Sequence, residues 1–173
     1  MIYSDPPYNI GFDYDKGIGT TGKYKGKKTD DSKSQAEYRA FLEATLQNGL
    51  NHCYSDAHVF YWCDQNYIGL LQDLYQHNGI DNKRVCLWIK NNQNVTPQIA
   101  FNKCYEPCVY GTRGKPYLSP KSQNLTEIAN PEIENGNRTI DDILDLLDIW
   151  LIKRLPTNEY QHATEKPVVL HDR

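Results

Sequence analysis

The chain has 173 residues and a mass of 20.0 kDa, which is enough for one domain with a hydrophobic core. Its net charge of −3 and pI near 5.9 argue against a general nucleic-acid coat protein, although an enzyme can keep its basic residues local. The apolar runs are too short to span a membrane, and the five cysteines lack Cys-x-x-Cys spacing. We therefore expect a cytoplasmic protein without a signal peptide, with reduced thiols and no metal site.

The chain begins with a short apolar segment, Met1 to Tyr3, which predicts a buried strand that leads into Asp5-Pro6-Pro7-Tyr8. Proline fixes its own φ and pushes the preceding residue out of the helical region, so this tetrapeptide is stiff and extended. At the carboxyl end of a strand, where open α/β sheets place ligands, it would hold a carboxylate, two carbonyls and a phenol in fixed relation. The plainer interpretation is a Pro-Pro turn.

Such a set of groups suits the methylation of an amino group on a nucleobase. The lone pair of an exocyclic amino nitrogen is delocalised into the ring, and two acceptors for its hydrogens, the Asp5 carboxylate and the Pro6 carbonyl, would make it a better nucleophile. Tyr8 would stack on the extruded base, a contact of about 1–3 kcal/mol, which partly offsets the few kcal/mol needed to unstack it.

Residues 11–33 are rich in Gly, Lys, Thr and Asp and predict a mobile loop. The formal dinucleotide fingerprint at 17–22 lies neither after a strand nor before a helix, so we interpret it as a coincidence. The loop would close over DNA phosphates with Lys23, Tyr24, Lys25, Lys27 and Lys28. The alternative is an ordinary solvated loop.

The middle of the chain alternates helical and strand patterns. A capping box at 34–37 opens a helix to about Cys53, and Asp64 would cap a second helix at 67–77. Strands are predicted at 57–63, 84–90, 108–112 and, as a strand or extended return, 148–152, with a short helix at 139–147. The strand at 108–112 should begin no earlier than Pro107, because proline cannot donate in a ladder, and Trp150 should pack in the core.

Two motifs together resemble a known family, the amino-methylating DNA methyltransferases that use S-adenosylmethionine. Asp5-Pro6-Pro7-Tyr8 is similar to their catalytic motif, and His162-Ala163-Thr164-Glu165-Lys166-Pro167 to a motif at the start of a cofactor-side helix, although the family usually has proline where Ala163 stands. The order of the motifs is that of the permuted (beta-type) subgroup. Asp in first position is usual for adenine N6 enzymes, whereas Ser is more usual for cytosine N4 enzymes.

The resemblance implies an α/β fold: a Rossmann-like methyltransferase sheet with helices on both faces and a β-hairpin at its edge, in a single domain over 1–173. It implies catalytic roles for Asp5, Pro6, Pro7 and Tyr8, and cofactor binding by Asp5, Thr164, Glu165, Lys166 and Pro167. Lys166 and the N–H groups of the helix that Pro167 opens would meet the donor's carboxylate. The alternative is simply a capped helix.

The resemblance also places target recognition at 113–147. The DNA contacts it suggests, beyond the loop lysines, are Asn9, Arg113, Lys115, Lys121 and Arg138, with ordinary surface charges as the alternative. In the permuted family a strand and a Phe-x-Gly-x-Gly loop would follow the last helix, and no segment here fits that motif. We therefore expect an incomplete sheet, in a fragment of a longer enzyme or in a chain whose cofactor motif comes from a partner chain or a homodimer.

The leading hypothesis is a site-specific methyltransferase that acts on the N6 amino group of a flipped adenine in double-stranded DNA. The alternatives are a cytosine N4 DNA methyltransferase and a non-catalytic DNA-binding fragment of such an enzyme, which would bind DNA but not the methyl donor.

Overall fold

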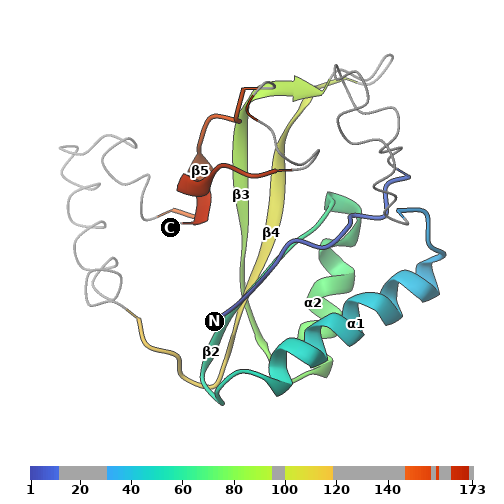
Figure 1. The fold of residues 1–173 in the computed structure, drawn as a ribbon, viewed down its shortest axis with the longest axis vertical. Helices are drawn as coiled ribbons and strands as arrows, with labels where there is room; N and C mark the ends of the chain where they lie inside the picture. The colour runs from blue at the N-terminus through green and yellow to red at the C-terminus, as the bar shows by residue number, and fades with distance from the viewer. Residues whose placement is uncertain (12–30, 95–99, 119–146, 157–158, 160–164, 172–173) are drawn as a thin grey trace.

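The computed structural model describes residues 1–11, 31–94, 100–118, 147–156, 159 and 165–171. These residues form a mixed sheet with two α-helices and short 3-10 turns (Figure 1). The elements in chain order are β1 (Ile2–Ser4), α1 (Gln35–Asn51), β2 (Ala57–Trp62), η2 (Gln65–Tyr67), α2 (Ile68–His77), β3 (Asp81–Asn94), β4 (Lys103–Arg113), β5 (Ile149–Leu151) and η4 (Val168–His171). The α/β class expected from the sequence is confirmed.

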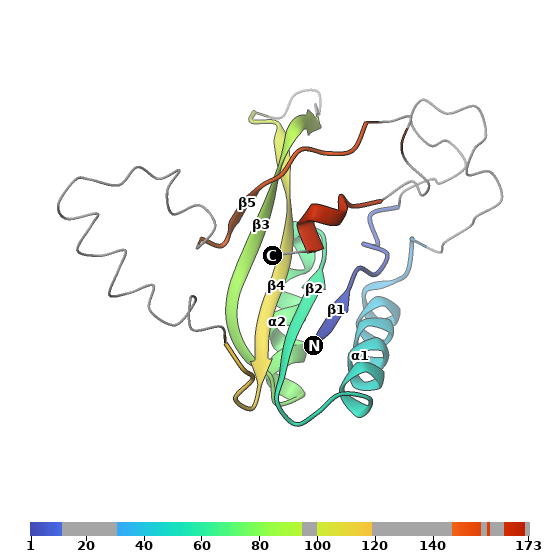
Figure 2. The same ribbon diagram turned by 60° about the vertical axis from the view of Figure 1, so that its left-hand side comes forward.

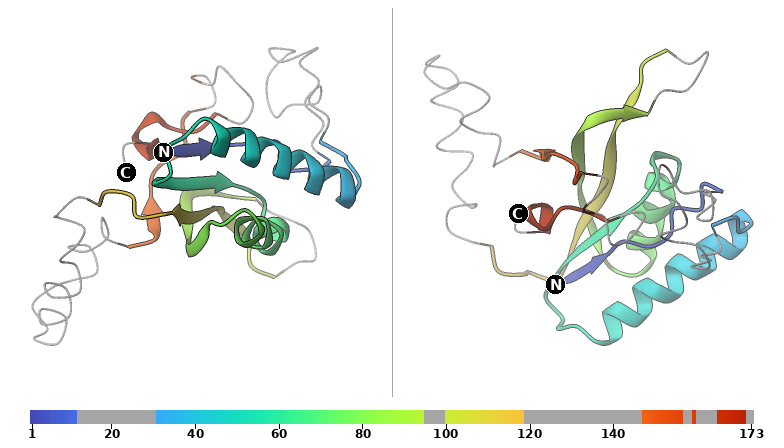
Figure 3. Two further views of the ribbon diagram at one scale, coloured as in Figure 1. Left: turned by 90° about the horizontal axis from the view of Figure 1, so that it is seen from below. Right: turned by 45° about the horizontal axis from the view of Figure 1, so that its top comes forward.

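The sheet has the strand order β1-β2-β4-β3-β5. β1 runs parallel to β2 and β5 parallel to β3, whereas β4 is antiparallel to both of its neighbours. Figure 2 shows the long β3–β4 pair at the centre, with β1 and β2 between it and α1. The two α-helices lie on one side of the sheet (Figure 3), so among the described residues the expectation of helices on both faces is met on the other side only by the C-terminal 3-10 turn η4.

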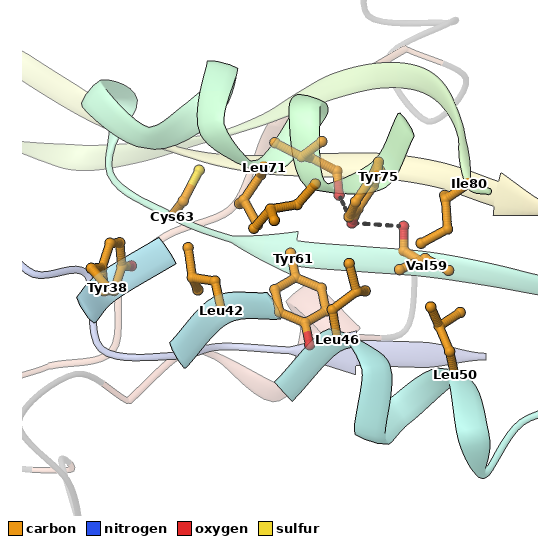
Figure 4. Packing of buried hydrophobic residues seen from close by; sticks show 12 residues of the cluster. Tyr38, Leu42, Leu46, Leu50, Val59, Tyr61, Cys63, Leu71, Tyr75 and Ile80 are labelled. Carbon is orange, nitrogen blue, oxygen red and sulfur yellow. Dashed lines mark hydrogen bonds between the residues drawn. The ribbon is translucent and has the colours of Figure 1, made fainter. Parts of the chain in front are cut away.

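The side of the sheet under α1 and α2, which we call the helix face, forms one apolar core (Figure 4). Leu42 and Leu46 from α1 and Leu71 and Leu74 from α2 are fully buried there against Val59, Tyr61 and Val109. The capping box at the start of α1 is present, because the Ser34 hydroxyl accepts from the Glu37 amide and the Glu37 carboxylate accepts from the Ser34 amide.

The opposite side, which we call the tryptophan face, is formed by the alternate residues of the same strands. Its core contains Trp62 of β2, Cys86 and Trp88 of β3, Cys108 of β4 and Trp150 of β5, closed over by Leu170 of η4. Trp150 is buried at 9% exposure, as its sequence context predicts. Cys63, Cys86 and Cys108 are buried free thiols.

Two details of the sheet differ from the sequence-based expectations. β4 begins at Lys103 and passes through Pro107, so the expectation that it starts no earlier than Pro107 is wrong. The Pro107 carbonyl accepts from the Cys63 amide, one residue beyond the end of β2. The N–H and C=O of one strand residue point to the same side, so the N–H that Pro107 lacks would point beyond the end of the β2–β4 ladder. The β3–β4 hairpin is also not at the sheet edge, since β2 and β5 flank it.

The expected helices at 34–53 and 67–77 are present with shifted boundaries, whereas the short helix expected at 139–147 lies, apart from residue 147, outside the described residues. Asp64 caps the 3-10 turn η2 through the Asn66 amide, and α2 begins only after that turn. Pro167 precedes a 3-10 turn rather than an α-helix. Within the described residues, none of the helices has the length and apolar character needed to cross a bilayer.

Candidate active site

The Asp-Pro-Pro-Tyr segment follows directly after β1, at the carboxyl end of that strand. Pro6 is buried, while Asp5 remains at the surface with its side chain 32% exposed. The Tyr38 hydroxyl of α1 donates to the Pro7 carbonyl at 2.8 Å, which holds the segment against the helix. The strand end and the two prolines therefore fix where Asp5 and Tyr8 lie.

A second anchor, on the C-terminal side of the motif, is Asn9, which has a positive φ of 56°. Its side chain accepts from the Lys33 amide at 2.6 Å and donates to the Lys33 carbonyl at 3.0 Å and to the Tyr67 hydroxyl at 3.1 Å. The buried Asp31 carboxylate accepts from the amides of Asn9 and Ile10. The structure thus places Asn9 in an internal clamp that joins the motif to the start of α1.

The centre of the site is a contact between the two sequence motifs. Lys166 Nζ donates to Asp5 Oδ2 at 2.6 Å and to the Tyr8 hydroxyl oxygen at 2.9 Å, although Lys166 is 161 positions from Asp5 in the chain. The Tyr8 hydroxyl in turn lies 3.0 Å from Asp5 Oδ1. The Lys166 side chain is only 4% exposed, and its ammonium lies 4.9 Å from the centre of the Trp62 ring.

Two further charged residues complete this cluster from the sheet. Glu106 Oε2 lies 3.1 Å from the Tyr8 hydroxyl and 3.4 Å from Lys166 Nζ, and Glu106 Oε1 accepts from Lys90 Nζ at 2.8 Å. Glu106 is the register partner of Trp88, and Lys90 follows two residues later on β3, so both extend the tryptophan face. The cluster therefore contains two carboxylates and two ammonium groups, and its formal charges balance.

The electrostatics of the cluster stabilise the charged form of Glu106 and the neutral form of Tyr8. Burial raises the pKa of the Glu106 carboxyl, but the ammonium groups of Lys166 and Lys90 together lower it, and the net pKa lies below the usual value. Burial and the negative charges of Glu106 and Asp5 raise the pKa of the Tyr8 phenol well above its usual value. At neutral pH, Tyr8 is thus a hydrogen-bond donor between two carboxylates.

The remaining residues predicted for the site are distributed in three ways. Glu165 and Pro167 flank Lys166 in the described part of the chain. Arg113 and Lys115 lie at and beyond the far end of β4 from Glu106, where the Arg113 guanidinium donates to the Leu50 carbonyl and the Lys115 amide to Asp56. The others fall outside the described residues: Lys23, Tyr24, Lys25, Lys27, Lys28, Lys121, Arg138 and Thr164.

Sequence reasoning missed Glu106 and Lys90. Lys90 is the last residue of the strand predicted at 84–90, and Glu106 lies two residues before the strand predicted at 108–112, so neither was proposed for the site. The signal that was available is the alternation Glu106, Cys108, Tyr110, which has the period of a strand and places the carboxylate on the same face as the buried aromatic residues.

The chemistry that this arrangement supports is hydrogen-bond acceptance by a fixed, partly exposed carboxylate. Asp5 is the most exposed member of the cluster, while Lys166 and Lys90 are only 4% and 10% exposed. A ligand at this surface would meet the Asp5 carboxylate first. Its natural counterpart is a group with polarised N–H bonds, such as an amino group.

Comparison with known proteins gives one match over the whole chain. A protein-family model described as DNA methylase, of the N6/N4 methyltransferase type, matches residues 1–173. Among solved structures, crystal structures of M1.HpyAVI and of the M1.HpyAVI–SAM complex are similar at 18% and 17% identity, each with a TM-score of 0.42 over 47% of this chain. The aligned part spans 45% of each of those two chains. A search of curated proteins found no match.

Proposed function

Because the chain belongs to the DNA methylase family of N6/N4 methyltransferases, we propose that it acts on the N6 amino group of an adenine in double-stranded DNA, with S-adenosylmethionine as the methyl donor. The observation that carries this proposal is the position of Asp5. Its carboxylate lies at the carboxyl end of β1, partly exposed, and is held from behind by Tyr8 and Lys166. The first residue of the tetrapeptide, Asp rather than Ser, favours adenine over cytosine by resemblance.

The role of the chain's own residues follows from the chemistry of an aromatic amine. Asp5 and the Pro6 carbonyl would each accept a hydrogen bond from the amino group, which raises the electron density on its nitrogen. When bound, S-adenosylmethionine would supply an electrophilic methyl group, and the amino nitrogen that receives it would release one proton to solvent. Asp5 and Pro6 would orient the nitrogen for this in-line attack.

The charges of the cluster fit a donor that carries both an ammonium and a carboxylate group. Asp5 would accept from the ammonium, and Lys166 would donate to the carboxylate, with Glu165, Pro167 and, outside the described residues, Thr164 beside them. Lys166 at present makes its shortest contact with Asp5, at 2.6 Å. Donor binding would therefore require Lys166 to share or exchange this partner.

Recognition of the DNA would divide among three regions. Tyr8 would stack on the flipped base, the lysines of residues 11–33 would contact phosphates, and residues 113–147 would read the sequence. Asn9, proposed from the sequence as a DNA contact, would act on the motif instead, because its side-chain amide is occupied by Lys33 and Tyr67. Arg113 and Lys115 lie at and beyond the end of β4 far from Glu106, so any DNA contact that they make would be distant from Asp5.

The test is methyl transfer from labelled S-adenosylmethionine to adenine-containing duplex DNA, followed by analysis of the modified nucleosides. Asp5→Ala should lower the rate by roughly 100- to 10,000-fold, the range for groups that act directly on the reacting atoms. The variant should stay folded, because Lys166 keeps Tyr8 and Glu106 as partners. Asp73→Asn is the matched control, since Asp73 pairs with Arg39 between α1 and α2.

Each outcome has a distinct meaning. Full activity of Asp5→Ala would contradict the assignment of the site. Label on N4 of cytosine would replace adenine by cytosine as the target. Calorimetry that detects DNA binding but no binding of S-adenosylmethionine would identify the chain as a non-catalytic DNA-binding fragment.

A further inference from the structure

The Tyr8 hydroxyl has more acceptors than it has protons. It lies 3.0 Å from Asp5 Oδ1 and 3.1 Å from Glu106 Oε2, and its own oxygen accepts from Lys166 at 2.9 Å. A phenol carries a single O–H proton. At any moment, therefore, only one of the two carboxylates receives the Tyr8 proton, and the other has an unused acceptor site facing the phenol.

The two carboxylates differ in how firmly they are held. Glu106 lies on β4 in the centre of the sheet, and Lys90 of β3, 10% exposed, holds its second oxygen at 2.8 Å. Asp5 lies beyond the end of the three-residue edge strand β1 and is 32% exposed. The Glu106 carboxylate is thus the fixed acceptor, whereas the Asp5 carboxylate is the one a ligand can reach.

Resting on the proposed function, we infer that Glu106 is a positioning residue that keeps Asp5 available for the target amino group. Its Oε2 atom accepts the Tyr8 proton while Asp5 Oδ1 accepts an N–H of the amino group. The Tyr8 hydroxyl then loses no hydrogen bond when the amino group arrives, and the Tyr8 ring keeps its place.

A purely structural role for Glu106 makes a different prediction. In that case Glu106 would only neutralise the buried Lys90 and Lys166, and its removal would weaken the fold whether or not Tyr8 carries a hydroxyl group. The positioning role acts through the Tyr8 proton. It therefore predicts that the effect of changing Glu106 depends on that proton.

The experiment combines Glu106→Gln, which preserves shape, with Tyr8→Phe, which removes only the hydroxyl. In the wild-type background, Glu106→Gln should lower the single-turnover rate of methyl transfer by roughly tenfold, the factor expected for one hydrogen bond to a charged group, with little change in the affinity for the donor. In the Tyr8→Phe background the same substitution should change the rate less than twofold, because no phenol proton competes for Asp5. Equal factors in both backgrounds would overturn the inference.

A second readout requires no activity. In protein labelled with 13C at the tyrosine ζ carbons, the Tyr8 signal at neutral pH, identified by its loss in Tyr8→Phe, should shift in Glu106→Gln, because the Tyr8 hydroxyl loses the charged acceptor 3.1 Å away. Asp73→Asn should leave that signal unchanged. An unchanged Tyr8 signal in Glu106→Gln would overturn the inference, whereas a wild-type chain that transfers no methyl group but passes this test would count against the proposed function alone.

Discussion

The helix face and the tryptophan face are built from the same strands but are organised differently. On the helix face, Leu42, Leu46, Leu71 and Leu74 are fully buried, and the buried Tyr75 hydroxyl lies 3.0 Å from the Val109 carbonyl oxygen, to which it donates. The tryptophan face ends instead in a cluster of charged side chains around Tyr8. The helix face is a closed apolar core, whereas the apolar core of the tryptophan face borders a polar site.

This difference teaches how one short sheet can separate stability from chemistry. Neighbouring residues such as Tyr61 and Trp62 point to opposite faces, so each strand contributes to both layers without compromise. The charged pairs do little for stability as a class, because desolvation offsets much of their attraction. We therefore expect substitutions on the helix face to affect folding first and substitutions in the charged cluster to affect ligand chemistry first.

The largest expected effect on stability is that of Leu46→Ala in α1. Leu46 has no exposed surface and packs within the helix-face core, so the substitution should lower the free energy of unfolding by about 3 kcal/mol. Urea unfolding followed by circular dichroism measures this change, and Asn48→Ala, at an exposed position of the same helix, is the control. A Leu46→Ala variant that keeps its stability but loses methyl transfer would break the separation between the two faces.

The sequence predicts the local parts of this comparison and misses the long-range parts. The capping box of α1, the strand at β2 and the Asp-Pro-Pro-Tyr segment depend on neighbouring residues, and the structure has all of them. The place of the β3–β4 hairpin and the start of β4 depend on pairing with distant strands. Local patterns carry no information on that pairing. Pro107 predicted the start of a strand, but β4 passes through Pro107 because its missing N–H faces the position beyond the end of β2.

The same limit applies to the site. Lys166 was predicted from its own motif, as a partner for the donor's carboxylate, and that role stays a prediction. Its contact with Asp5 joins residues 161 positions apart, which only the folded chain brings together. Glu106 and Lys90 are single charged residues on adjacent strands, and their pairing depends on the register between β3 and β4.

A smaller effect on stability is expected at Gly111, where β4 contributes to the helix face. A Cβ atom added at Gly111 would lie 2.8 Å from the Asp81 carbonyl oxygen, from Ile80 and from the Tyr75 ring. Gly111→Ala should therefore destabilise the protein by about 1–3 kcal/mol, because backbone must shift to make room. Gly69→Ala in α2 is the matched control: a Cβ there meets nothing within 4 Å, and alanine favours the helix by up to about 1 kcal/mol.

Urea midpoints of the two glycine variants, measured side by side, decide this point. Opposite signs are the expected result. A Gly111→Ala variant as stable as the wild type would mean that the helix face tolerates displacement of β4, and the comparison with the more open tryptophan face would lose its basis.

The smallest expected effect is a pH dependence of the free energy of unfolding that arises from the charged cluster. The pKa of Glu106 is lowered in the folded state, so its charged form stabilises the fold above the unfolded pKa of about 4.3, and this contribution disappears as the pH falls through the folded pKa. The stability difference between wild type and Glu106→Gln should therefore be constant from pH 7 to about pH 5 and shrink below it. For Leu46→Ala, which changes no titrating group, the difference should stay constant over the same series. If the Glu106→Gln difference were equally flat, Lys90 and Lys166 would not stabilise the Glu106 charge, and the two faces would differ in composition but not in their response to pH.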